Sequence, residues 1–112
     1  MAKTRVAVEF GMGTSIRKQD YTGAAIRGLK DALWHNSLSI TEAFGFKKEA
    51  MLVDVEIAVQ QPMSVDLTKL EEILPYGQST FKVIKGGLDI IKPDCKGATV
   101  VANVAVIVSF NM

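Results

Sequence analysis

The densest group of hydrogen-bond donors and cations in the sequence lies between residues 11 and 20. A Gly-Met-Gly run is followed there by two hydroxyl residues, two basic residues and an aspartate. The candidate ligand-binding residues are Gly11, Met12, Gly13, Thr14, Ser15, Arg17, Lys18 and Asp20. Free backbone amides, hydroxyls and cations together can hold a carboxylate or a phosphate. The segment therefore predicts an anion-binding loop, and the alternative is a plain connection between a strand and a helix.

The same run does not match a dinucleotide-binding motif. The third glycine of that motif would fall at Ile16, and the helix is expected to start only at Asp20, which is too late for a tight phosphate turn. We therefore reject a dinucleotide site and expect no cofactor.

Other reactive side chains are few. Ser15 and Lys18 could act as a nucleophile and its base, but no third group orients them. The single cysteine, Cys95, and the single histidine, His35, cannot form a usual zinc site within one chain, so we expect no metal. With one cysteine no intrachain disulfide can form, which is typical of a cytoplasmic protein.

Hydrophobic periodicity predicts one α+β domain over residues 1–112 with the order β-α-β-α-β-β. Asp20 and Asp66 are expected to cap the two helices. A further helical turn is expected over residues 39–44, and residues 88–97 are expected to form a loop. The expected strands cover residues 5–10, 51–60, 79–85 and 98–110, with a break after the first at residues 11–15. These elements predict a four-stranded mixed sheet with two helices packed on one face, in which the last strand is central or spans the whole sheet.

The sheet face opposite the helices is expected to mix charged with aliphatic side chains. Phe10 is assigned to the helix side with Val6 and Val8. The expected open-face residues are Ala7, Glu9, Leu52, Asp54, Glu56, Ala58, Thr80, Lys82, Ile84, Thr99, Val101, Asn103, Ala105 and Ile107. Such mixing, in a chain that is 48% hydrophobic, indicates a contact between subunits, with Lys82 neutralising Glu9 or Glu56. The alternative is a solvent-exposed face with scattered apolar residues.

The overall charge argues against two classes of partner. Thirteen basic and twelve acidic residues leave a net charge of +1. This balance offers no electrostatic reason to expect nucleic acid or an anionic membrane as a partner.

Several short motifs resemble those of the Lin-type conserved hypothetical proteins, a family of small bacterial and plant-plastid proteins of unknown function. The resemblance covers nearly the whole chain. The motifs are Gly11-Met12-Gly13-Thr14, Gln19 to Ala25, Lys30-Asp31-Ala32, Leu74-Pro75-Tyr76-Gly77 and Lys85-Gly86-Gly87. The family signature is glycine-x-glycine-x-Asp-x-His-Gly. This sequence has Ser15, Arg17 and Lys18 at the Asp, His and last Gly positions, so the polar centre of the signature is missing.

Asp20-Tyr21-Thr22 also resembles a helix start in one repeat of the ring-opening amidohydrolases. Those enzymes carry a serine and two glycines after the next strand, where this sequence has Gln60-Gln61-Pro62, so the nucleophile is absent. The resemblance implies fold and assembly: threefold packing of small α+β units, with ligand pockets between units. A chorismate-mutase-like or YjgF-like assembly is the form that we expect.

The leading hypothesis is a cytoplasmic homo-oligomer, most simply a trimer, that binds a small polar or anionic metabolite between subunits. One alternative is an enzyme on the same scaffold, either an amide hydrolase or a lyase or isomerase. Another is a structural or partner-binding protein without a small ligand.

Overall fold

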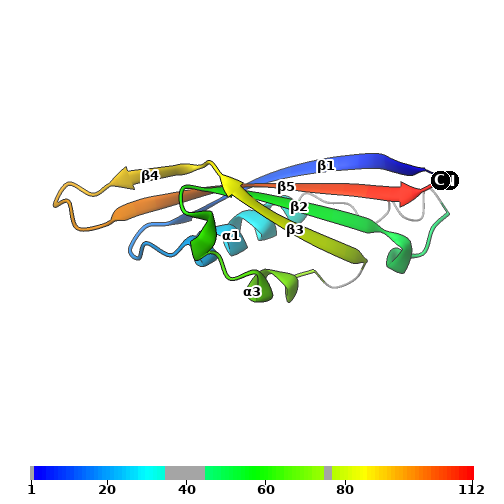
Figure 1. The fold of residues 1–112 in the computed structure, drawn as a ribbon, viewed down its shortest axis with the longest axis horizontal. Helices are drawn as coiled ribbons and strands as arrows, with labels where there is room; N and C mark the ends of the chain where they lie inside the picture. The colour runs from blue at the N-terminus through cyan, green and yellow to red at the C-terminus, as the bar shows by residue number, and fades with distance from the viewer. Residues whose placement is uncertain (1, 35–44, 75–76) are drawn as a thin grey trace.

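The computed structural model describes residues 2–34, 45–74 and 77–112, and the turn expected over residues 39–44 lies outside them. The elements are β1 (Lys3–Ser15), α1 (Tyr21–Trp34), the 3-10 turn η1 (Lys48–Ala50), β2 (Leu52–Val59), the 3-10 turn η2 (Pro62–Ser64), α3 (Leu67–Glu71), β3 (Gln78–Lys85), β4 (Leu88–Ile91) and β5 (Ala98–Asn111). Figure 1 shows α1 and α3 on the same side of the sheet. This confirms the α+β class and the placement of both helices on one face.

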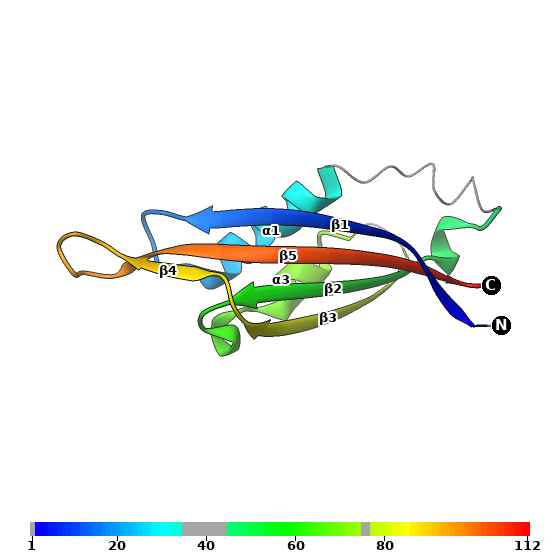
Figure 2. The same cartoon turned by 90° about the horizontal axis from the view of Figure 1, so that it is seen from above.

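The sheet is mixed and is organised around its last strand. Its order is β1-β5-β2-β3, and β5 runs antiparallel to both β1 and β2, while β2 and β3 are parallel. Figure 2 shows β5 between its two neighbours along most of its length. The prediction of a central last strand is therefore confirmed. Strand β5 alternates buried with partly exposed residues over most of its length, and its buried valines form the centre of the core.

The predicted count of four strands is wrong, because part of the segment expected as a loop is a fifth strand. Strand β4 pairs with the first residues of β5, Leu88 opposite Val101 and Ile91 opposite Ala98. It is reached through Gly86 and Gly87, which pass over the end of β2. Gly87 has φ +63°, and the side-chain amide of Gln60 donates to both glycine carbonyls, at 3.0 and 3.2 Å. Together β4 and the start of β5 form an arm that extends beyond the body of the sheet (Figure 2).

The predicted break at residues 11–15 is also wrong, because β1 continues through both glycines to Ser15. These glycines allow the backbone of α1 to lie directly on β1. A Cβ atom at Gly13 would overlap the backbone of Ala24 and Gly28, and one at Gly11 would overlap Gly28 and Ala32. The residues of α1 that face β1 are small and recur every four positions, at Ala24, Gly28 and Ala32, so the helix presents a flat stripe to the strand. The glycines are therefore required by packing.

A β-bulge changes which side chains of β1 face the helices. Arg5 pairs with Ser109 and Ala7 pairs with Val108, so one extra residue is inserted between them. Beyond the bulge the alternation is reversed, which places Phe10 on the open face, where it is 70% exposed. The sequence-based assignment of Val8 and Phe10 to the helix side was therefore wrong, as was that of Ala7 and Glu9 to the open face.

Both predicted helix caps are confirmed. The Asp20 carboxylate accepts a hydrogen bond from the Gly23 amide at 2.9 Å, and the Asp66 carboxylate accepts one from the Thr68 amide at 3.1 Å. Each carboxylate satisfies a helix N–H group that has no partner within the helix. No helix within the described ranges is long and apolar enough to cross a membrane.

The close contact between α1 and β1 gives the first testable prediction. Gly13→Ala should lower the free energy of unfolding by about 3 kcal/mol or more, because the added methyl group meets helix backbone that cannot move aside. Gly45→Ala is the control. Nothing lies within 4 Å of its added Cβ, so it should cost only about 1 kcal/mol of strain from its positive φ. Urea denaturation measures both, and equal costs would contradict the packing role of Gly13.

Candidate functional site

The loop between β1 and α1 encloses a basic hollow of about 440 Å³. Its lining residues are Thr14, Ser15, Ile16, Arg17, Lys18, Asp20 and Arg27. Five of the eight predicted ligand-binding residues are among them. The structure therefore brings together the polar part of the predicted loop, and it adds Arg27 from the exposed side of α1.

A serine at the end of β1 fixes the shape of this loop. The Ser15 hydroxyl donates to the carbonyl oxygen of Lys18 and accepts from the backbone amide of Asp20 at 3.3 Å. Ser15 is only 4% exposed, so these bonds are shielded from water. The hydroxyl proton is directed to a backbone carbonyl and not to the Lys18 ammonium. This geometry does not support Ser15 and Lys18 as a nucleophile and base.

Two long cations brace the loop from outside. The Arg27 guanidinium donates to the Thr14 carbonyl at 2.6 Å, and the Lys92 ammonium donates to the Arg17 carbonyl at 2.9 Å. The second bond joins the loop to the arm. Sequence spacing places Arg27 on the exposed side of the helix but does not indicate that it reaches this loop.

The charge inside the hollow is predominantly positive. Arg17, Lys18 and Arg27 line it, together with a single carboxylate, that of Asp20, which already caps α1. The hydrogen bond from Gly23 orients the Asp20 carboxylate toward the helix end and offsets the partial positive charge there. Attraction for an anion therefore comes from the side-chain cations.

The other three predicted residues lie outside this hollow. Gly11 and Gly13 pack under α1, and their backbones belong to the β1–β5 ladder. Met12 is 58% exposed on the open face, and its amide donates to the Asp31 carboxylate at 3.0 Å. The expectation that these amides are free to bind a ligand was therefore wrong, because a strand and a helix already use them.

A buried pair anchors the arm next to the hollow. The Tyr21 hydroxyl donates to Asp89 of β4 and accepts from the Gln19 side-chain amide at 2.9 Å. Burial raises the pKa of Tyr21, and its hydrogen bond to Asp89 raises this pKa further. The second carboxylate oxygen of Asp89, Oδ1, is buried without a hydrogen-bond partner among the described residues. This pairing holds the arm to the start of α1.

The open face of the sheet is divided into two halves along its length. Nearest the arm it is mostly apolar, and the large exposed side chains of this apolar half are Phe10, Met12, Ile84, Leu88 and Ile90, with Val101 partly exposed among them and the exposed amide of Asn103 opposite Met12. At the other end it is charged, and this charged half consists of Lys3, Arg5, Asp54, Glu56, Thr80 and Lys82. The mixture of charge and hydrocarbon expected for this face is present, with the hydrocarbon concentrated toward the arm and Glu56 at the border of the two halves, where it lies near Phe10 and Ile84.

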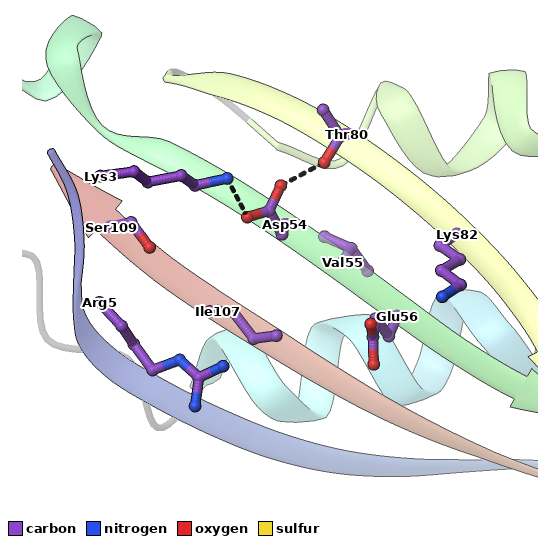
Figure 3. Close-up of a pocket in the computed structure, with 9 residues that line it drawn as sticks. All are labelled: Lys3, Arg5, Asp54, Val55, Glu56, Thr80, Lys82, Ile107 and Ser109. Carbon is purple, nitrogen blue, oxygen red and sulfur yellow. Dashed lines mark hydrogen bonds and ion pairs between the residues drawn. The ribbon is translucent and has the colours of Figure 1, made fainter. Parts of the chain in front are cut away.

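The charged half contains a second hollow, of about 390 Å³, which also reaches Val55, Ile107 and Ser109 (Figure 3). The Lys3 ammonium lies 2.7 Å from Asp54 Oδ2, and the Thr80 hydroxyl donates to the other oxygen of the same carboxylate. These two hydrogen bonds hold the pKa of Asp54 below its usual value. Glu56 lies opposite Lys82 in the register of β2 and β3, but no ion pair joins them, so the neutralising contact expected from the sequence is not formed.

The fold and its hollows define a small α+β protein with a basic loop and an uncovered sheet face. Among the described residues no group of three or more histidine, cysteine or acidic side chains could hold a metal ion. A family model described as "Conserved hypothetical protein (Lin0512_fam)" matches residues 5–108, so the chain belongs to this family of conserved hypothetical proteins. The Lin-type resemblance is thereby confirmed.

A solved structure agrees with this assignment. The chain is similar to an FtsZ-like protein of unknown function from Nostoc punctiforme, with 31% sequence identity and a TM-score of 0.89. The match covers 100% of this chain and 99% of that one. No curated protein sequence matches the chain.

The anchor of the arm gives the second prediction. Tyr21→Phe should lower the free energy of unfolding by about 1–3 kcal/mol, because it leaves a buried carboxylate oxygen without its donor. The wild type should also lose stability as the pH rises above about 10, where tyrosine of the unfolded chain ionises while folded Tyr21 stays protonated. Urea denaturation between pH 8 and pH 11 should show this extra loss in the wild type and not in Tyr21→Phe. Parallel curves would contradict the raised pKa.

Proposed function

We propose that the protein binds a small anionic metabolite in the basic hollow of the loop between β1 and α1, and that it does so as a homo-oligomer. The observation that supports binding is the set of three cations, Arg17, Lys18 and Arg27, around a hollow with one carboxylate. Guanidinium and ammonium groups hold carboxylates and phosphates through short, charge-assisted hydrogen bonds. The single cysteine supports a cytoplasmic location for this function.

We propose binding and not catalysis because the polar groups of the loop already form structural hydrogen bonds. The Ser15 hydroxyl and the Asp20 carboxylate are both used to shape the loop and the helix end. The Arg17 and Lys18 side chains are exposed and can meet a ligand from solvent.

In the proposed assembly, a second copy of this chain covers the apolar half of the open face. Four large side chains there, Phe10, Met12, Leu88 and Ile90, are each more than half exposed. Monomeric proteins rarely leave several large apolar side chains uncovered on one face. The neighbouring charged half carries three cations and two carboxylates, so its near-balanced charge does not strongly repel a second copy that contacts the apolar half. A trimer is the state that we propose, from the resemblance to threefold assemblies of similar units.

The third prediction tests the basic hollow. In the wild type, inorganic phosphate and citrate should raise the thermal unfolding midpoint, since a ligand that binds the folded state stabilises it. Arg17→Ala/Lys18→Ala should weaken that binding by about tenfold or more, because it removes two charged donors. The midpoint without anion should stay nearly the same, since both side chains are exposed.

The matched control is Lys69→Ala/Lys85→Ala, which removes the same charge from two other exposed sites. An equal loss of anion binding in both double variants would show a general charge effect and would reject the hollow.

The fourth prediction tests the assembly. Light scattering of the full chain at micromolar concentration should give a mass that is a multiple of 12.2 kDa. Val101→Asp should reduce that mass to a single chain, because it places an unpaired carboxylate inside the proposed contact. Gln78→Glu adds the same charge on β3, outside the apolar half, and should leave the mass unchanged. A wild-type mass of one chain would reject the assembly. It would not decide anion binding, which the third prediction tests separately.

A further inference from the structure

The bulge in β1 places one arginine where regular strand geometry would not. Val8, Phe10 and Met12 lie on the open-face side of β1, and unbroken alternation would turn position 5 toward the helices. The extra residue between Arg5 and Ala7 restores Arg5 to the open face, where it lines the hollow of the charged half. Bulges are frequent beside functional sites because they redirect a side chain in this way.

Arg5 has a buried hydroxyl as its neighbour. It pairs with Ser109 across β1 and β5, and Ser109 is 3% exposed and lines the same hollow. Figure 3 shows the Ser109 oxygen between the Lys3 and Arg5 side chains. No hydrogen bond joins the Ser109 hydroxyl or the Arg5 guanidinium to any other residue in the described part of the chain. The Ser109 hydroxyl and the Arg5 guanidinium are therefore two donors that line one hollow side by side.

Among the described residues, one ion pair is formed in this hollow. Lys3 holds Asp54, which also accepts from Thr80, while Glu56 and Lys82 are opposite each other in the strand register without an ion pair. The Arg5 guanidinium likewise forms no ion pair with a carboxylate in the described part of the chain. Between Arg5 and Glu56 lies the hydrocarbon side chain of Ile107 (Figure 3).

We propose that this hollow is a second binding site and that it takes a small aliphatic carboxylate. The Arg5 guanidinium donates two hydrogen bonds to the carboxylate and the Ser109 hydroxyl donates a third. The short hydrocarbon part of the ligand lies on Ile107. The site lies in the charged half, outside the apolar half assigned to assembly and apart from the basic hollow of the loop. It therefore stands independently of the proposed function.

The test is a titration of the isotope-labelled full chain with sodium butyrate, followed by NMR. The Ser109 amide and Ile107 methyl signals should shift and reach saturation. Butylammonium chloride, which has the same hydrocarbon chain and the opposite charge, should not shift them. Inorganic phosphate should shift them much less than butyrate, since it lacks the hydrocarbon part. An equal response to phosphate and butyrate would overturn the assignment to a carboxylate.

Variants connect the response to the named residues. Arg5→Gln should weaken butyrate binding by about 10- to 100-fold, because it removes charged hydrogen bonds, and Ser109→Ala by several-fold. Lys85→Gln removes an exposed cation from β3. This control should give the same butyrate-induced shifts of the Ser109 and Ile107 signals as the wild type. Wild-type affinity in Arg5→Gln and Ser109→Ala, with folding confirmed by unchanged signals elsewhere, would overturn the proposal.

Discussion

The direct contact between the backbones of α1 and β1 is the constraint on which the rest of this structure depends. Gly11 and Gly13 leave no room for a side chain under the helix, and Gly28 lies close enough to β5 that an added Cβ would be 2.7 Å from a Val104 methyl. Helices usually pack on sheets through interleaved side chains. Here small residues on both surfaces replace them, so the position of α1 is set by backbone shape.

This position of α1 also determines how the last residues of β1 are covered. Asp31 reaches the Met12 amide and Arg27 reaches the Thr14 carbonyl, so the helix covers polar groups of β1 that would otherwise be open to pairing. The start of α1 is placed beside Ser15, which forces the chain through the short loop that carries Arg17 and Lys18. The basic hollow is therefore a consequence of the same packing.

The family signature acquires a physical meaning from this arrangement. Its two glycines are the residues over which α1 packs. The positions that differ from the signature, Ser15, Arg17 and Lys18, all line the hollow that follows. Ser15 takes the aspartate position without its negative charge, and its hydroxyl braces the loop. Lys18 adds a positive charge at a glycine position. In this protein the loop therefore carries more positive charge than the signature itself would give it.

The sequence by itself determined the α+β class, both helix caps, the central place of the last strand and the polar loop residues that line one hollow. These features follow from local periodicity and local hydrogen bonding, which nearby residues specify. Only the tertiary structure decided the role of Gly11 and Gly13, the contribution of Arg27 and the existence of β4, because each depends on a segment distant in the chain. It also decided that Arg5 and Phe10 share the open face, since one inserted residue in β1 reverses the alternation. Such an insertion is visible only once β1 and β5 are in register.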